Sequence, residues 1–317
     1  IEAVRRESKE DRKVSLEKLC KIYNQSRQSF YRHQEREQGR ASYYEWILNL
    51  VKAIRKRMPQ IGGKNLWSLI RRFQRMLKVP LIGRDRLAIF LRENGLKVRW
   101  PKRRTVKTTY SGHRYAVQPN LAKELEVTRP NQLWVADITY ISIKGSAGYL
   151  FLITDKHSKV IVGHFIAPTL HASGAIEALN RALISHGFPL EVIHHSDRGV
   201  QYCCHDFLDE IRRWKLRSSM TDADHCAQNA LAECMNGIMK REFLLNLGFS
   251  SFEQAQQAID EAVWTYNNLR IHGALNGKTP TEVHTGIDSA PLQLWLSEIV
   301  AFEAPLPNNK AFGVNSI

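Results

Sequence analysis

Three consecutive apolar runs between residues 133 and 167 constrain the fold of this chain most strongly. They read "LWVADITYISI", "GYLFLITD" and "KVIVGHFIA", with turn residues at 145–148 and 156–158 between them. Alternating runs that are rich in β-branched and aromatic residues and bounded by turn signals are typical of strands. The short connections predict a three-stranded antiparallel meander.

Helical and extended patterns alternate after the meander. The sequence predicts a helix over 172–186, a strand at "LEVIHHS", a helix around 205–214, a short strand at "LRSSM" and a helix at "NALAECMNGIMKREFLL". This is the element order of an α/β ribonuclease H-like core, a mixed five-stranded sheet with flanking helices. The first and fourth strands lie side by side in that topology.

Three acidic residues stand at positions where these elements can meet. Asp137 lies inside the first run, where aspartate is depleted and costly to bury without cations or donors. Asp197 closes the fourth strand, and Glu233 lies on the last helix. Hard oxygen ligands suit Mg²⁺ or Mn²⁺, so we predict that the three carboxylates form a two-metal phosphoryl-transfer centre.

The helix that carries Glu233 has a polar stripe. Asn229, Glu233, Asn236 and Lys240 are spaced i, i+4, i+7 and i+11, so they share one face. A cation two turns beyond a metal-binding carboxylate is well placed for a substrate phosphate, which predicts that Lys240 contacts that phosphate. Asn236 is expected on the solvent side of the helix.

Other polar residues near these strands have simpler explanations. His194 and His195 precede Asp197 and could bind metal, but a structural role at the strand end is the commoner one. Asp155 lies in a turn, where aspartate bonds to its own backbone. Ser196 has no G-x-S-x-G context that would make it a nucleophile.

Charge is distributed very unevenly along the chain. Residues 1–110 hold 29 Lys or Arg and 10 Asp or Glu, a net of +19, whereas the remaining 207 residues have a net of −4. A basic front third joined to a slightly acidic body indicates a polyanion-binding module attached to a separately folded domain.

The basic third contains helical patterns. Residues 14–37 predict a helix-turn-helix in which Ser26 caps the second helix and Tyr23 and Tyr31 join the core. Helices over 43–58, 64–77 and 84–94 carry cations on their polar faces, and 101–111 resembles a basic linker that follows a phosphate backbone. The predicted DNA contacts in these segments are Arg27, Gln28, Arg32, Arg55, Arg57, Arg71, Arg72, Arg84, Lys102, Arg103 and Arg104.

The patterns divide the chain into five predicted regions. These are a helix-turn-helix at 1–40, a second helical DNA-binding module at 41–100, a basic linker at 101–125, a catalytic domain at 126–285 and a C-terminal tail at 286–317. The five cysteines form no C-x-x-C pair, which indicates a reduced cytoplasmic compartment. The sequence contains neither a run of 18 apolar residues nor a signal peptide, so we expect no membrane partner. Because residue 1 is Ile, we expect the chain to start inside a longer product.

Four ordered strings carry a family resemblance: "NQLWVADITYI", "HHSDRGVQY", "QNALAECMNGIMKREFL" and "YNNLRIHGALNGKTPTEVH". They resemble the catalytic half of insertion sequence 3 family transposases, strongly over about residues 115–285 and more loosely over 14–110. The family's acid triad then falls on Asp137, Asp197 and Glu233, and its Asn and basic residue fall on Asn229 and Lys240, which are both expected to contact DNA. The segments "DADHCAQN" and "QIGGKNLW" depart from the family pattern.

The resemblance implies a DDE-type DNA transposase. Such an enzyme cleaves the ends of an insertion element and joins the 3′-hydroxyl to target DNA with two Mg²⁺ or Mn²⁺ ions. Its partners would be double-stranded DNA, as terminal inverted repeats and target, and further copies of itself, at the bacterial nucleoid. An upstream reading frame can be fused ahead by frameshifting in this family. Arg270 and His272 match its terminal motif, with structural and DNA-backbone roles both open.

Two alternatives remain at this point. A retroviral-type integrase has the same chemistry, but its zinc module needs paired His and Cys, and the first 110 residues contain only Cys20. A domesticated DNA-binding regulator without catalysis is disfavoured by the intact acid triad, and an activity assay distinguishes it.

Overall fold

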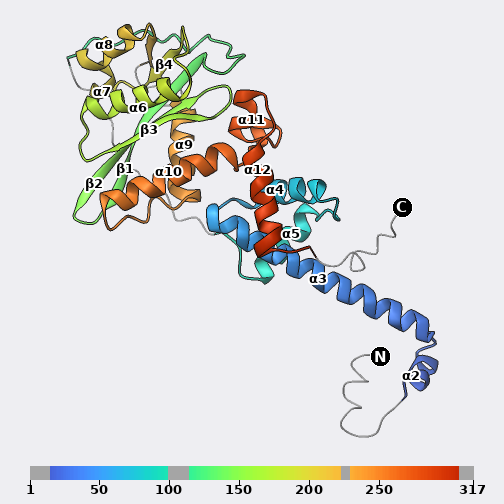
Figure 1. Ribbon diagram of the computed structural model, residues 1–317. Helices are drawn as coiled ribbons and strands as arrows, with labels where there is room; N and C mark the ends of the chain where they lie inside the picture. Colours follow the sequence, from blue (N-terminus) through green and yellow to red (C-terminus); the bar gives the residue numbers. More distant parts are fainter. Residues whose placement is uncertain (1–14, 99–113, 223–228, 307–317) are drawn as a thin grey trace. The chain divides into compact units, whose positions relative to one another are not determined.

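The computed structural model of this chain describes residues 15–98, 114–222 and 229–306 (Figure 1). The chain divides into two compact units. One consists of residues 1–53, 74–81 and 296–317, and the other of residues 54–73 and 82–295. The larger unit contains the sheet and the three acidic residues.

The sheet has the mixed five-stranded topology that the sequence predicts. Its strands are β1 (Leu133–Ile143), β2 (Ser146–Asp155), β3 (Ile161–Ala167), β4 (Ile193–Ser196) and β5 (Arg217–Met220). The order is β3-β2-β1-β4-β5, with β1, β2 and β3 antiparallel and β1, β4 and β5 parallel. The predicted meander and the ribonuclease H-like fold class are therefore confirmed.

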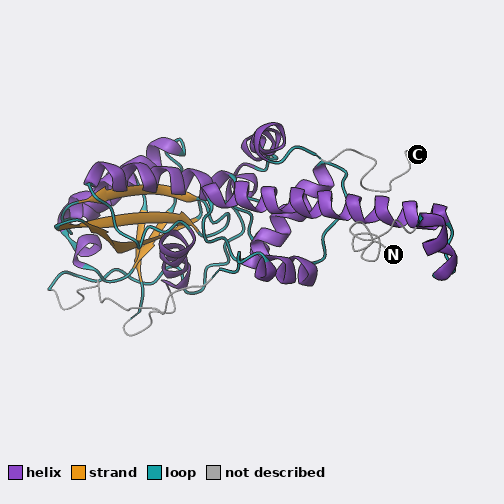
Figure 2. Ribbon diagram, turned by 90° about the horizontal axis from the view of Figure 1, so that it is seen from below, coloured by secondary structure: helices purple, strands orange, loops and turns teal. Residues whose placement is uncertain are grey.

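Alternation along β1 separates two apolar layers. Trp134, Ala136 and Ile138 belong to the main core, together with residues of α6 (Ala172–Ser185) and α8 (His205–Arg213). Leu133 and Val135 pack on the opposite face with Ala232 of α9 (Ala230–Glu242). Helices flank both faces of the sheet (Figure 2). Because side chains alternate, Asp137 shares its face with Leu133 and Val135, toward α9.

A glycine permits the close packing of α6 against β3. A Cβ atom on Gly163 would lie 2.3 Å from the carbonyl oxygen of Ala178, which no side chain tolerates. The helix therefore approaches the strand backbone directly. The connection after β4 is the short helix α7 (Val200–Cys203), and α10 (Phe252–Asn268) follows α9 with Ser251 as its N-cap.

Two amphipathic helices precede the sheet, α4 (Gly63–Met76) and α5 (Arg84–Glu93). The apolar faces of these helices are largely buried, with Leu66, Leu69 and Ile70 of α4 fully so. Arg72 of α4 donates to Glu282 of α11 (Pro280–Thr285) and to the carbonyl of Gly277. This ion pair ties the helical segment to the chain beyond the sheet. The remaining elements are η2 (Gly273–Leu275), α12 (Ala290–Glu298) and the π-helical turn η3 (Ile299–Glu303).

The smaller unit begins with α2 (Leu16–Ile22) and most of α3 (Arg27–Arg57). Ser26 caps α3 as predicted, accepting from the backbone N–H of Ser29 at 3.0 Å. Two expectations are corrected here. The predicted helices ending at 37 and starting at 43 form one helix, because the intervening "QGRAS" holds one glycine and no proline, a cost of only about 1 kcal/mol in a long helix. Tyr23 and Tyr31, expected in the core, are exposed.

Polar contacts close this smaller unit. The indole of Trp46 donates to the carbonyl of Ala304 at 3.0 Å. The hydroxyl of Tyr43 donates to the carbonyl of Pro80, which also accepts from Gln74. These contacts join α3 to the 74–81 segment and to the end of the chain. None of the helices in the described residues combines the length and apolar character needed to cross a membrane.

Candidate active site

Asp137 occupies the middle of β1, opposite Leu152 of β2. Its Oδ1 accepts from the backbone N–H of Ile138 at 2.9 Å, and its Oδ2 accepts from the side-chain amide of Asn236 at 2.7 Å. Burial, followed by the charge of Asp197, raises the pKa of Asp137 to about 7, although both hydrogen bonds oppose the shift. The carboxylate is therefore held where its own negative charge is unfavourable, which a cation would relieve.

Asp197 follows the last residue of β4, and β4 lies parallel beside β1. Its Oδ1 accepts from the backbone N–H of Gly199 at 3.0 Å. Burial, followed by the charges of Asp197 and Asp137, raises the pKa of the Tyr202 phenol well above its usual value. The first and fourth strands thus bring Asp137 and Asp197 together, as their predicted adjacency requires.

Glu233 lies in the first turn of α9 and is exposed. Its charge also raises the pKa of Asp137, but by less than the charge of Asp197 does. Among the residues that the structure describes, no three His, Cys, Asp or Glu side chains form a complete metal-binding group. Two of the predicted ligands thus lie on neighbouring strands, whereas the third lies exposed in the first turn of α9.

Two asparagines dock α9 onto β1. Asn229, the N-cap of α9, is buried and donates to the carbonyl of Ala136 at 3.1 Å, so its amide bonds to the strand next to Asp137. Asn236 is buried as well, and its expected position on the solvent side is wrong. Their spacing was the available signal, because both asparagines lie on the side of α9 that meets β1, while Glu233 on the same helix remains exposed.

Lys240 is the last residue of the polar stripe on α9 that begins at Asn229, and it is half-buried. Burial lowers the pKa of Lys240, and the charge of Asp137 opposes this shift, so the ammonium group lies near that carboxylate. The neighbouring Arg241 turns along its own helix, where its Nε donates to the carbonyl of Gly237 at 3.0 Å. The helix phase deduced from spacing therefore distinguishes the two cations.

The two histidines before Asp197 are core residues. His194 lies against the rings of Tyr202 and Phe207, and burial lowers its pKa to about 3. His195 shares a 2.8 Å hydrogen bond with the hydroxyl of Ser219, and burial lowers its pKa to about 4. Both rings are therefore neutral at physiological pH and serve the packing of β4.

Arg270 and His272, the residues of the terminal motif, make hydrogen bonds inside the fold. Arg270 is buried and donates two hydrogen bonds to Glu242 of α9, at 2.7 and 2.9 Å. A third contact, 2.7 Å long, joins its guanidinium to the ring of His272. Since the guanidinium is occupied inside the fold, the structure favours the structural role that the sequence left open.

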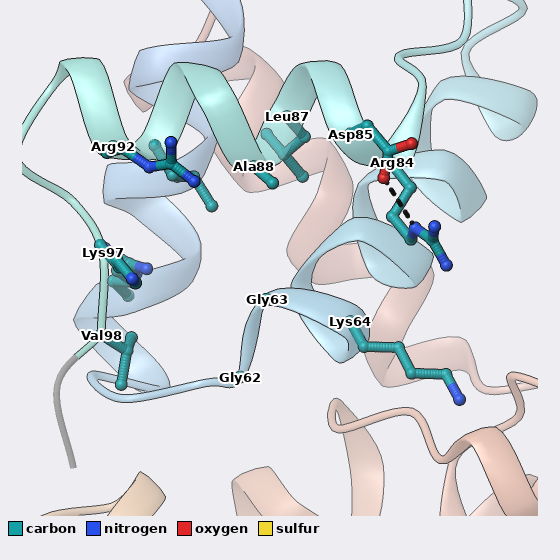
Figure 3. A pocket seen from close by; sticks show the side chains of 12 residues that line it. Gly62, Gly63, Lys64, Arg84, Asp85, Leu87, Ala88, Arg92, Lys97 and Val98 are labelled. Carbon is teal, nitrogen blue, oxygen red and sulfur yellow. Dashed lines mark hydrogen bonds and ion pairs between the residues drawn. The ribbon is translucent and has the colours of Figure 1, made fainter.

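The predicted DNA contacts have several different surroundings. Arg72 is paired with Glu282, a structural role that the sequence did not indicate. Arg71 stacks over Trp67 at 4.9 Å, and Arg57 lies over Trp264 at 5.8 Å. The exposed ones on the first turns of α3 are Arg27, Gln28 and Arg32, and those beside a cavity are Arg55 and Arg84 (Figure 3). The predicted contacts outside the described residues are Lys102, Arg103 and Arg104.

The chain is similar to known protein families and to individual known proteins. A model of the integrase core domain matches residues 127–226, and a second integrase core model matches residues 215–280. An insertion element IS600 protein of 31 kDa from Shigella sonnei is 32% identical over 267 residues, which cover 83% of this chain and 96% of the relative. The chain belongs to the insertion sequence 3 family of transposases. It is a DNA transposase with a core of the DDE polynucleotidyl-transferase type.

A second curated relative agrees with the family assignment. The transposase InsF for insertion sequence IS3A from Escherichia coli strain K12 is 28% identical over 280 residues, covering 86% of this chain and 95% of that protein. Among solved structures, the magnesium complex of the HTLV-2 integrase catalytic core domain has a TM-score of 0.41 and 23% identity, over 49% of this chain and 97% of that one. Membership in a family of insertion-element transposases decides against the retroviral-type integrase alternative.

Proposed function

We propose that this insertion sequence 3 family transposase cleaves the ends of its element and joins the freed 3′-hydroxyl to target DNA at the site formed by Asp137, Asp197 and Glu233. One observation supports the proposal above the others. Asp137 and Asp197 come from adjacent parallel strands, and burial followed by the charge of Asp197 raises the pKa of Asp137 to about 7. Such crowding of carboxylates is typical of divalent-cation sites.

The donor set fits Mg²⁺ or Mn²⁺, because it consists of hard oxygen atoms. Asp137 and Asp197 would hold the ions, two in number, and Glu233 would complete the coordination from α9. When bound, the ions supply activation of the attacking oxygen and neutralisation of the charge that develops at the scissile phosphate. Lys240, on the same helix face, would hold a non-bridging phosphate oxygen of the DNA near the carboxylates.

The surroundings of the site keep these groups in position. Hydrogen bonds from Ile138 and Asn236 orient both oxygens of Asp137 before any ligand arrives. Asn229 fixes the first turn of α9, which carries Glu233, to β1. The chain therefore supplies a preorganised acid cluster, and preorganisation is the main protein contribution to phosphoryl transfer.

The substrate is double-stranded DNA, as the element's terminal inverted repeats and as target. We propose that residues 1–40 and 41–100, followed by the linker at 101–125, bind the element ends, and that residues 126–285 carry out catalysis, ahead of the tail at 286–317. Two ends must be held together for concerted joining, so the active form would be a homo-oligomer assembled on DNA at the bacterial nucleoid.

A joining assay tests the proposal. The full chain is incubated with labelled duplexes that carry the ends of its own element and with a plasmid target, in Mg²⁺, in Mn²⁺ or in EDTA. We expect metal-dependent nicking at the element end and covalent joining to the plasmid. End binding without any cleavage or joining in either metal would instead support a DNA-binding regulator that has lost catalysis.

A further inference from the structure

A cavity of about 510 Å³ lies in the larger unit between the end of α3, the start of α4, the α5 helix and residues 97–98 (Figure 3). It is far richer in cations than in anions. The cationic side chains that line it are Arg55, Lys64, Arg84, Arg92 and Lys97, and the acidic one is Asp85. A concave surface with this charge concentrates anions by focusing the electrostatic field.

Three of these five cations have no partner among the described residues, whereas Arg84 pairs with Asp85 at 3.0 Å. Within the described part of the chain, Lys64, Arg92 and Lys97 form neither an ion pair nor a side-chain hydrogen bond. The Nε of Arg55 is buried and without a hydrogen-bond partner there, and burial lowers the pKa of this guanidinium. A buried guanidinium nitrogen without an acceptor is unfavourable, so the cavity presents an unsatisfied donor to a ligand.

The cations stand apart from one another around an apolar wall. Figure 3 shows Arg92 and Lys97 toward one end of the cavity and Lys64 and Arg84 toward the other. Leu87 and Ala88 of α5 lie in the wall between them, together with Leu91 and Val98. A ligand that fits this lining has anionic groups at separated positions and an apolar part in the middle.

The N-terminus of α4, which lines the cavity, favours anions too. Gly62 and Gly63 line it, and α4 begins at Gly63 without an acidic residue in its first turn. The N–H groups at the start of a helix of this length carry a partial positive charge that is available to an anion. A Cβ atom on Gly63 would meet nothing within 4 Å, so the approach to these N–H groups is open.

The cavity continues beyond the space for one small anion. A second cavity of about 490 Å³ shares Arg55, Arg92, Lys97 and Val98 with the first. The pair therefore forms a longer groove in which the shared cations stand at the junction, and the second cavity adds Pro59, Gln60, Gly95 and Leu96. An extended polyanion fits a groove of this kind better than an isolated phosphate does.

We propose that this groove, lined by Arg55, Lys64, Arg84, Arg92 and Lys97, binds the sugar–phosphate backbone of duplex DNA. Successive phosphates occupy the two cationic ends, and the deoxyribose between them lies against Leu87 and Ala88. The inference rests on the proposed function, because it assigns part of the DNA contact to a defined pocket. A defined binding groove of this kind differs from the diffuse electrostatic attraction of a basic protein for DNA.

The test compares two kinds of variant in the full chain. The double variant Arg92→Gln/Lys97→Gln removes two cations from the groove, and the matched control Lys52→Gln/Arg86→Gln removes two exposed cations that do not line it. The variant Ala88→Leu fills the groove without changing charge. Binding to a labelled duplex with the element end is measured as a function of salt, because the slope of log affinity against log salt counts phosphate contacts.

We expect Arg92→Gln/Lys97→Gln to lower the salt slope by about two and to weaken binding on the order of tenfold, and the control to change both less. Ala88→Leu should weaken binding although it removes no charge. Equal effects of groove and control doubles, with normal binding by Ala88→Leu, would overturn the proposal in favour of a diffuse basic surface. Thermal unfolding of each variant identifies any loss caused by misfolding.

A further arm distinguishes DNA from a small phosphate ligand. If inorganic phosphate stabilised the wild type against heat while Ala88→Leu bound DNA normally, the groove would be a small-anion site and the proposal would be wrong. Joining by the wild type in Mg²⁺ is measured beside these assays. Normal joining with unaltered DNA binding by the groove variants rejects the groove alone, whereas absence of joining by the wild type rejects the proposed function.

Discussion

The side-chain amide of Asn236 donates a 2.7 Å hydrogen bond to Oδ2 of Asp137. The donor lies on α9 and the acceptor on β1, so this bond fixes the helix of Glu233 to the strand of the first aspartate. Since the backbone N–H of Ile138 bonds to the other oxygen of the same carboxylate, the protein fixes the orientation of both oxygens of Asp137. A ligand that arrives at this carboxylate meets a group that needs little reorganisation.

The first prediction concerns this positioning contact. Asn236→Leu removes the hydrogen bond and should lower the joining rate by roughly tenfold to a hundredfold, as loss of an outer partner of a metal-binding group does. The Mg²⁺ concentration for half-maximal rate should rise, while affinity for end DNA stays normal. Cys234→Ser, at an exposed position of the same helix, is the control. An unchanged Mg²⁺ requirement in Asn236→Leu would show that the contact serves only packing.

The second prediction concerns the three acids themselves. Asp137→Asn, Asp197→Asn and Glu233→Gln should each reduce cleavage and joining by at least about a thousandfold, because positioning of the metal carries most of the barrier reduction in such centres. End binding, measured by gel shift, should persist in all three. Near-normal joining by any one of them would remove that residue from the proposed ligand set.

The third prediction is a pH dependence of Mg²⁺ binding. The pKa of Asp137 is raised from 3.8 to about 7, so the metal-free fold favours the protonated form, and this contribution to stability is lost as the pH rises through about 7. Below that pH, Mg²⁺ has to displace a proton. Mg²⁺ should therefore bind roughly thirtyfold more weakly at pH 5.5 than at pH 8. The reason is that pH 5.5 lies about 1.5 pH units below the pKa of Asp137, so most of its carboxyl groups are protonated there.

The measurement for this third prediction is the rise in Tm with added Mg²⁺ at the two pH values. We expect a larger rise at pH 8 in the wild type and almost none at either pH in Asp137→Asn. An equal rise at both pH values would mean that Asp137 does not titrate against the metal.

The fourth prediction concerns the buried pair between Arg270 and Glu242. Arg270→Ala leaves the carboxylate of Glu242 buried without its partner, and removing one member of such a pair costs about 3 to 5 kcal/mol of unfolding free energy. Urea unfolding measures this loss. The matched variant Arg72→Ala breaks a pair in which the arginine is partly exposed, and it should cost less. If Arg270→Ala instead unfolded normally and bound DNA poorly, the residue would be a DNA contact.

Parts of this architecture were predictable from residues alone, for physical reasons. Strand alternation in "LWVADITYISI" and the spacing from Asn229 to Lys240 are local patterns, so this strand and the phase of α9 follow from them, whereas the sheet order and the adjacency of Asp137 and Asp197 follow from the ribonuclease H-like topology that the element order matches. Partners that are distant in the sequence are not encoded locally. The bonds from Asn236 to Asp137 and from Arg72 to Glu282 depend on which helix face meets which surface, and a polar stripe looks the same whether it meets solvent or a sheet.

The last prediction separates two adjacent cations on α9. Lys240 lies near Asp137, whereas Arg241 is turned about 100° around the helix and bonds to the carbonyl of Gly237. Lys240→Ala should reduce joining by about one to two decades, as expected for loss of a charged hydrogen bond of about 1.5 to 3 kcal/mol made mainly in the transition state, with Mg²⁺ dependence retained. Arg241→Ala should join nearly normally. A crippled Arg241 variant beside a normal Lys240 variant would mean that the DNA approaches α9 from the other face, and the phosphate role would then pass from Lys240 to Arg241.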